Sequence, residues 1–483
     1  MTNLPSNTTE ANLVGEEPIA VERSTAPSTT LAPVDWIKQN LFSNVRNSII
    51  TLIVGALAAI AIYSGVRWII GADFEIVRVN LRNFMIGQFP RDELWRPWAS
   101  GLIIATTLGL VSGALAHNAY DTAQQMGVPA HRDSYPQLVR RFWPLIAVMI
   151  FFVSFARTVL PYIGLASVFV VVLLFREIGW RLPASFRSRV VYVGAILAVL
   201  SMLVIAGTSN LGGLAMGIIA AIWMASEVGR MTPLPGMAGT LRTFGLSALA
   251  FVVAYFVVAL IPFDGFGWED WGGIHISLFT MVIGITLGMP FGILLAIGRR
   301  SNLPVIKTAS TIFIEFVRGV PLISLLLFSN LMLRNFFPLS FEIPADLTMA
   351  IIVITGFSAA YIAEIVRGGL QAVPKGQTEA AQASGMSPGK VQRLIVLPQA
   401  LRAVIPAMVG QFISLFKDTS LLSIIGITEF LRVTDVANAQ PAFSGKQLAP
   451  VTYLFVAIGY WAFAYTMSRE SRRLETKLGI GVR

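Results

Sequence analysis

Ionisable and hydroxyl side chains occur inside apolar stretches of this sequence, where they need either a partner or a function. Lys417, Asp418, Thr419 and Ser420 directly follow one such stretch. By residue count they fall between the middle and the outer edge of a membrane span, where ionisable groups are costly and usually functional. Such groups can replace the water around a charged solute, which is the chemistry of a transport path. The alternative is that Lys417 and Asp418 pair with each other or with a neighbour for structure alone.

A second string combines charge with residues that break helices. Arg318-Gly319-Val320-Pro321 interrupts an apolar run, and broken helices in transporters present polar groups to a substrate. Glu364 and Arg367 belong to the next apolar run. Because Arg318, Glu364 and Arg367 fall near span ends by count, we interpret them as structural or gating residues more readily than as substrate ligands.

Residues that could catalyse a reaction are sparse. The chain has no cysteine, which excludes disulfides, thiolate metal sites and cysteine nucleophiles. His117, His131 and His275 have no second histidine or carboxylate at ligand spacing, and we expect structural or interfacial roles for them. The segment 385–391 is similar to a phosphate-binding loop, but it has one residue too few before Gly-Lys and ends in valine. We therefore predict no catalytic residue, no metal site and no nucleotide site in this chain.

Composition places the chain in a membrane. Of 483 residues, 55% are hydrophobic and 13% are charged, whereas soluble domains carry about 25% charged residues. A single soluble core stops growing near roughly 250–300 residues and cannot bury this much apolar sequence. The sequence predicts an all-α, polytopic membrane protein. The formal net charge of +10 arises from Lys and Arg between apolar runs, which indicates topology rather than nucleic-acid binding.

About twelve stretches approach the roughly 20 apolar residues that cross a bilayer. They are 48–70, 98–116, 143–160, 161–175, 190–206, 212–225, 241–262, 271–297, 311–333, 343–365, 403–416 and 450–467. The segment 143–175 contains Arg157 and Pro161, so it predicts either two tight spans or one span and a re-entrant segment. The segment 212–225 is short for a span.

Charge placement supports this count. The basic loops 180–189, 299–307 and 366–402 and the basic C-terminus all fall on one side if seven spans precede residue 263. The loop 71–97 is the exception, because it carries four arginines yet falls outside; we interpret it as an amphipathic segment on the membrane surface.

Four regions follow from these patterns. We expect a disordered cytoplasmic tail (1–45), an N-terminal membrane region without chemical motifs (46–265), a motif-rich membrane core (266–474) that contains a long loop (366–402), and a short cytoplasmic tail (475–483).

The long loop is unusual, because membrane-protein connections are usually short. Glu379–Ala383 favours a helix, Gly385 suits its end, and Ser387-Pro388 suits the start of another. Apolar residues then recur at helical spacing until Pro398 interrupts the run. We expect two short helices with a small-residue face, held flat at the inner surface. An ordinary pair of interfacial helices is the alternative.

The spacing within the loop is more specific than that alternative requires. The full pattern of E-A-A, Gly and I-x-L-P is formed by Glu379, Ala380, Ala381, Gly385, Ile395, Leu397 and Pro398. It resembles the EAA loop of ABC importer permeases. Further strings are similar to those of the permeases for histidine, glutamine and other polar amino acids: 314–322, 361–369, 374–377, 397–400 and 415–421. This resemblance covers about 271–474, and the long region before it is similar to the AapM-type subunit of general L-amino acid importers.

The resemblance implies a function and partners. It implies a five-helix permease core with about seven extra spans in a bacterial inner membrane, importing an L-amino acid by alternating access. The implied partners are a cytoplasmic ABC ATPase dimer that binds ATP and Mg, a second homologous permease, and a periplasmic amino-acid-binding protein. The EAA loop would dock on the ATPase. The expected substrate path consists of Arg318, Gly319, Ser324, Ser358, Tyr361, Glu364, Lys417, Asp418, Thr419 and Ser420.

The chain departs from the family pattern at three polar positions. Val320 replaces a threonine, Ile323-Ser324-Leu325 stands where a glutamine often occurs, and Phe357 replaces an asparagine. We therefore expect the partner permease to hold most polar substrate contacts. The alternatives are an ion-coupled secondary transporter, which would need internal repeats and buried carboxylates, and a membrane scaffold without its own path. We detect neither repeats nor a chain of carboxylates.

Overall fold

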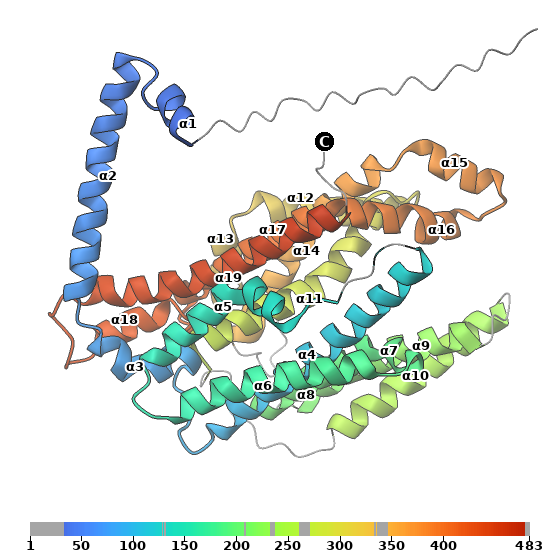
Figure 1. Cartoon of the computed structure of the whole chain (residues 1–483). Helices are drawn as coiled ribbons and strands as arrows, with labels where there is room; N and C mark the ends of the chain where they lie inside the picture. Colours follow the sequence, from blue (N-terminus) through green and yellow to red (C-terminus); the bar gives the residue numbers. More distant parts are fainter. Residues whose placement is uncertain are drawn as a thin grey trace, which may run out of the picture. The chain divides into compact units, whose positions relative to one another are not determined.

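The computed structural model describes residues 33–127, 129, 132–206, 209–231, 237–259, 271–332, 335 and 346–478, and these residues are almost entirely helical (Figure 1). The chain divides into two compact units, Met1–Ala72 and Asp73–Arg483. Each unit is described by itself.

The first unit contains two helices. Helix α1 (Pro33–Asn40) lies within residues 1–45, the range predicted as a disordered tail. The prediction is therefore wrong for residues 33–40, and residues 1–32 lie outside the described part. Helix α2 (Val45–Gly71) is apolar and, at 27 residues, long enough to cross a membrane. Asn44 caps it by accepting a hydrogen bond from the Asn47 amide at 2.8 Å.

The second unit begins with an N-terminal extension. Its helices are α3 (Glu75–Ile86), α4 (Trp95–Gln125), α5 (Tyr135–Ser154), α6 (Leu160–Arg181), α7 (Ala184–Arg187), α8 (Val190–Ala206), α9 (Ser209–Met231) and α10 (Met237–Ala259). The segment 143–175 therefore belongs to two helices rather than to a re-entrant loop. Helices α4 and α6 approach so closely that a Cβ at Gly113 or Gly179 would overlap the facing backbone.

Helix α3 corrects the interpretation of the loop 71–97. Ile76, Val77 and Phe84 are inaccessible to solvent, so one side of the helix packs within the protein rather than resting on the membrane surface. Phe84 packs edge-on against Phe455 with ring centroids 5.0 Å apart. The sequence suggested a surface segment because four arginines lie in the loop 71–97, and sequence alone does not show which apolar side chains meet a neighbouring helix.

The C-terminal core follows the extension. It comprises α11 (Gly273–Arg299), α12 (Pro304–Gly319), α13 (Leu322–Leu331), α14 (Asp346–Ala372), α15 (Lys375–Ala383), α16 (Pro388–Val391), η3 (Gln392–Val396), α17 (Leu397–Asp418), η4 (Thr419–Ile425), α18 (Arg432–Asn438) and α19 (Ala449–Leu478). Helices α11 and α14 pack most closely, since Gly284, Gly288 and Gly292 form one face of α11 against α14. Small residues four apart allow such close packing in membranes.

The helices account for the predicted spans. Eight described helices are long and apolar enough to cross a membrane, and the bent pair α12–α13 makes a ninth if it is one span. Three shorter apolar segments, Val190–Ile205, Ala215–Val228 and Arg242–Val258, correspond to the remaining predicted stretches. Helices α12 and α13 meet at 101° where the string 318–321 predicted a break, because Pro321 cannot donate a backbone hydrogen bond and opens the second helix.

Candidate functional site

The predicted coupling loop forms a projecting hairpin of helices. Helix α15 stands out from the body of the protein beside α16 (Figure 1). Glu379 and Ala380 lie exposed on it, while Ala381 is buried and belongs to the apolar cluster below. Gly385 turns the chain with a φ of +78°, a conformation that favours glycine. The hairpin therefore exposes small residues and one carboxylate on its outer face. Its base is held by apolar contacts in the core.

The return arm of the hairpin is continuous with a membrane helix. Residues from α16 pass through one π-helical turn, Gln392–Val396, directly into α17, and the whole segment Pro388–Ile425 qualifies as one span. The prediction that Pro398 breaks the run is therefore wrong. The π turn closes with a bond from the Leu397 amide to the Gln392 carbonyl, and its wider ring gives the proline room that an α-helix lacks.

A cluster of five charges joins three core helices near the base of the hairpin. Arg299 ends α11, Glu315 and Arg318 lie on α12, and Glu364 and Arg367 lie on α14. Arg299 contacts Glu315 at 2.7 Å and Glu364 at 3.4 Å, and Arg318 contacts Glu364 at 3.6 Å. Arg367 Nε donates to Glu364 at 2.9 Å. Three arginines thus share two carboxylates, so the cluster keeps a positive charge in excess.

Arg318 is the residue of this cluster with a buried nitrogen, Nε, that lacks a hydrogen-bond partner. Its guanidinium lies 5.6 Å from the centre of the Tyr361 ring, and that ring lies tilted against the Phe357 ring with centroids 4.7 Å apart. Arg318 also directly precedes Gly319, the exposed residue where α12 ends. A cation beside a bent helix can hold a carboxylate or move with the bend.

Comparisons with known proteins show the family of this chain. Residues 288–478 match the family described as the binding-protein-dependent transport system inner membrane component. The chain is 31% identical over 480 residues to the glutamate/glutamine/aspartate/asparagine transport system permease protein BztC of Rhodobacter capsulatus, covering 94% of this chain and 95% of BztC. The chain belongs to the amino-acid ABC transporter permeases. This permease is therefore a multi-pass membrane subunit of an ABC importer.

Two further similarities each cover less than half of the chain. The permease is 46% identical over 213 residues to the inner membrane amino-acid ABC transporter permease protein YhdY of Escherichia coli, which covers 44% of this chain and 57% of YhdY. A solved crystal structure of an amino acid ABC transporter with histidines shares 30% identity over 42% of this chain and 92% of that chain, with a TM-score of 0.38.

Ser358 does not lie on an exposed path in this permease. Its side chain is 0% exposed, and its Oγ has no hydrogen-bond partner. A Cβ at Gly288 would lie 3.0 Å from it, so Ser358 fills the contact between α11 and α14. Ser324 and Gly319, by contrast, are exposed on the bent pair, and Tyr361 is partly exposed.

The four residues 417–420 divide between surface and core. Lys417 is exposed at the end of α17 and Asp418 is partly buried; no ion pair joins either residue to another one in the described part of the chain. Thr419 is buried and donates to the Phe416 carbonyl at 2.7 Å, and the Ser420 carbonyl accepts from Ser423 at 2.7 Å. Thr419 is thus withdrawn into the core, whereas Lys417, Asp418 and the partly exposed Ser420 keep accessible surface.

Two residues of the charge cluster were not predicted as site residues from the sequence. Arg299 was assigned to topology and Glu315 to a motif string, yet both hold α11 and α12 to Glu364. Their sequence separation gives no signal, because the contact depends on how α12 folds back along α11. Among the described residues no three His, Cys, Asp or Glu side chains are placed to hold a metal ion.

The sequence analysis also did not identify one buried carboxylate, that of Glu429. Glu429 is 0% exposed and follows η4. It accepts hydrogen bonds from the Leu431 and Arg432 amides at 2.8 and 2.7 Å, from Tyr460 at 3.0 Å and from Ser277 at 3.4 Å. Glu429 thereby joins the starts of α11 and α18 to α19. Burial raises the pKa of Glu429 to about 7, despite these donors.

Proposed function

We propose that this chain is one of two membrane subunits that form the translocation path of an ATP-driven importer for polar or acidic amino acids. The observation that carries the proposal is the full-length similarity to BztC together with a projecting hairpin that bears Glu379. The glutamate, glutamine, aspartate and asparagine in the name of BztC support the substrate class. The surplus positive charge around Arg318 supports an acidic or amide substrate over a basic one.

The hairpin would dock on a cytoplasmic ABC ATPase, which supplies the ATP and Mg sites. Its exposed small residues permit close approach by another protein, and its second arm runs without a joint into α17. A push on the hairpin would therefore move a membrane helix. Alternating access requires such a rigid connection.

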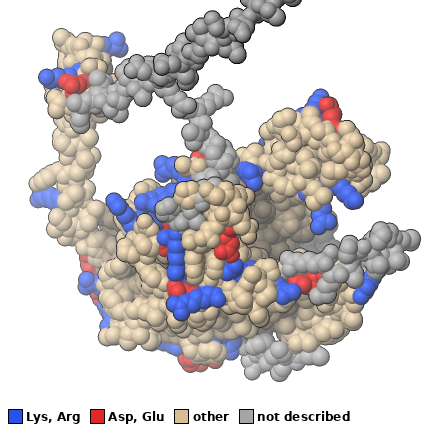
Figure 2. All heavy atoms as spheres, turned by 45° about the vertical axis from the view of Figure 1, so that its right-hand side comes forward, with Lys and Arg blue, Asp and Glu red and all other residues tan. Residues whose placement is uncertain are grey.

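The N-terminus and the hairpin would face the cytoplasm. Basic residues gather at and after the ends of α6 and α11 along the chain, including Arg181, Arg187, Arg189, Arg299 and Arg300. Figure 2, which brings the right-hand side of Figure 1 forward, has more blue than red side chains on this face. Positively charged loops remain inside during membrane insertion. A periplasmic binding protein would then deliver the substrate to the opposite face.

The second membrane subunit would be a different, homologous permease. Val320 and Phe357 are apolar where the family pattern is polar, and Ser358 is buried between helices. This chain therefore offers few polar groups to a substrate, and the partner would provide the remainder.

Reconstitution tests the proposal. The chain is coexpressed with its genomic neighbours, purified, and placed in proteoliposomes that contain ATP and Mg, and uptake of labelled glutamate is measured with and without the binding protein. We expect a copurified ATPase, a second permease and uptake that requires ATP. Uptake that continues without ATP and collapses with an uncoupler would contradict the proposal, and so would a chain that copurifies with no ATPase.

A further inference from the structure

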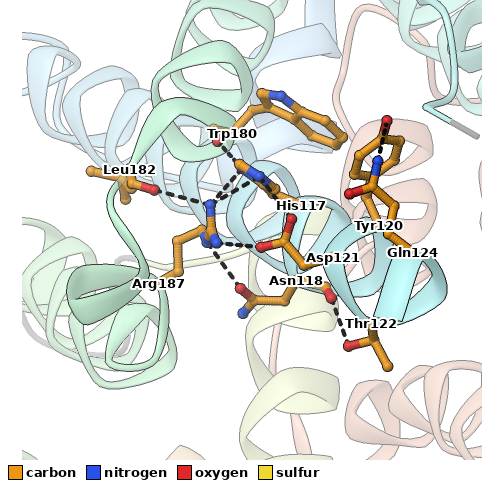
Figure 3. A network of polar contacts seen from close by, with 9 residues as sticks. All are labelled: His117, Asn118, Tyr120, Asp121, Thr122, Gln124, Trp180, Leu182 and Arg187. Carbon is orange, nitrogen blue, oxygen red and sulfur yellow. Dashed lines mark hydrogen bonds and ion pairs between the residues drawn. The ribbon is translucent and has the colours of Figure 1, made fainter. Parts of the chain in front are cut away.

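The hairpin of α15 and α16 is held without polar side-chain contacts to its surroundings. Across the described residues, no side-chain hydrogen bond or ion pair joins residues 375–391 to another helix. The short helix α7 of the extension differs, because Arg187 donates to Asn118 at 3.0 Å, to the Leu182 carbonyl at 3.2 Å and to Asp121 (Figure 3). The direction in which the hairpin points therefore depends on apolar contacts and on how its return arm enters α17.

The buried residues of the return arm change their spacing at the π turn. Five of them belong to one apolar cluster: Val391, Val396, Ala400, Val404 and Met408. Val391 and Val396 are five residues apart, whereas the others follow at intervals of four. Intervals of three or four keep residues on one face of an α-helix, and an interval of five does not. The π turn therefore accommodates one additional residue, and it thereby keeps Val391 on the buried face.

Pro398 explains why the helix keeps this wide turn. In an α-helix the amide of residue 398 would donate to the Leu394 carbonyl, but proline has no amide and its ring collides with that carbonyl. In the π turn the Leu397 amide donates to the Gln392 carbonyl instead. Alanine at position 398 would remove the collision and restore the missing donor. Pro398→Ala therefore favours contraction of the π turn to an α-helix.

The register of the return arm also affects the outgoing arm. Ala381 of α15 is 8% exposed and belongs to the same apolar cluster as Val391, while Glu379 lies exposed on the same helix. A contraction by one residue turns the return arm by about 100°, which brings polar Gln392 toward the cluster in place of Val391. The two arms then no longer share their apolar contact in the same way, and the direction of Glu379 changes.

We propose that Pro398 is a positioning residue for the ATPase contact, because it maintains the π turn that sets the rotational angle of the hairpin about α17. Pro398 acts through this turn and not by touching the ATPase. The proposal rests on the proposed function for the identity of the partner. It adds that the hairpin meets the ATPase at one angle, which is fixed by the number of residues between Val391 and Val396.

Three variants of the full chain test this register in the reconstituted complex. Pro398→Ala allows the turn to contract. Pro398→Ala combined with deletion of Leu394, whose side chain is 58% exposed, removes the additional residue and returns Val391 to the buried face. Pro406→Ala is the matched control, because Pro406 lies inside α17, away from the π turn. For each variant, the copurified ATPase and the number of amino acids imported per ATP hydrolysed are measured.

The orientation of the hairpin is measured separately from transport. The chain has no cysteine, so spin labels can be attached to the purified full-length chain through Gln382→Cys on the hairpin and Asn302→Cys after α11. Both positions are exposed. Pulsed electron paramagnetic resonance then gives the distance between the two labels in the wild-type background and in each of the three variants.

We expect Pro398→Ala to shift the label distance and to lower the import ratio or the amount of bound ATPase. Deletion of Leu394 in the same chain should restore both, and Pro406→Ala should change neither. A Pro398→Ala variant with the wild-type distance and ratio would overturn the proposal, and so would a combined variant as defective as Pro398→Ala. A wild-type complex without ATP-dependent uptake would refute the proposed function, whereas the label distances would still decide the register.

Discussion

Two carboxylates with several polar partners each hold neighbouring helices of this permease together. Glu364 is shared by three arginines, and Glu429 is held by four donors. Both carboxylates join helices that are distant in sequence. Single residues of this kind fix the relative position of helices more firmly than apolar contacts, which give little net attraction between helices in lipid.

The raised pKa of Glu429 gives a testable dependence of stability on pH. The folded protein binds a proton with a pKa of about 7, whereas an unfolded glutamate binds it near 4.3. Between these values the folded state holds more protons, so the free energy of unfolding should fall as pH rises from about 4.5 to 7, by roughly 3 kcal/mol.

Glu429→Gln tests this dependence. The variant keeps the shape of the side chain and cannot titrate, so the thermal midpoint of the purified permease should change less with pH than in the wild type. An exposed carboxylate variant, Asp92→Asn, is the control. Identical pH profiles for wild type and Glu429→Gln would show that Glu429 does not titrate in this range.

Many of the secondary-structure elements could be predicted from the sequence. Twelve apolar stretches correspond to helices, and the string 318–321 predicted the bend between α12 and α13, because glycine and proline act locally. Other features depend on tertiary packing. The sequence could not show that α3 is buried, that a π turn accommodates Pro398, or that Ser358 faces Gly288. Each of these depends on which surface a neighbouring helix presents.

The close packing of α11 on α14 leads to a prediction at Gly292. A Cβ there would lie 2.7 Å from the Ala359 carbonyl and from Ile362, so Gly292→Ala should separate the helices and destabilise the protein by roughly 1–3 kcal/mol. Gly368→Ala on α14 is the matched control, because nothing lies within 4 Å of its Cβ. The thermal midpoints in one detergent measure both variants, and equal midpoints would argue against tight packing.

Within the second unit, two sets of contacts join the extension to the core. Helix α3 packs against the core at one end, and an ion pair between α5 and α19 joins them at the other. Asn80 and Gln440 exchange side-chain hydrogen bonds at 3.2 and 2.6 Å, and a Cβ at Gly87 would meet the Gly272 backbone at 2.5 Å. Arg141 and Glu470 link α5 to α19 at the opposite ends of these helices. The extension is thus an integral part of the permease.

Phe84 should be the most sensitive apolar residue of this junction. It is completely buried against Phe430 and Phe455, so Phe84→Ala should cost roughly 3–5 kcal/mol of stability. Phe244→Ala on α10 is the comparison, because Phe244 is 73% exposed and should tolerate the change. Thermal midpoints and protease sensitivity of the two variants measure the difference, and equal losses would show that α3 does not anchor the extension.

We propose that the hairpin bearing Glu379 transmits ATPase motion through a continuous helix into α17. The most direct measurement is the number of amino acids imported per ATP hydrolysed by the reconstituted complex, for wild type and Glu379→Lys. Asp92→Lys, an exposed charge reversal on the extension, is the control. We predict that Glu379→Lys abolishes uptake, either with hydrolysis uncoupled from it or with the ATPase lost from the complex, while Asp92→Lys retains the wild-type ratio. An unchanged ratio in Glu379→Lys would show that the hairpin does not couple ATP hydrolysis to uptake.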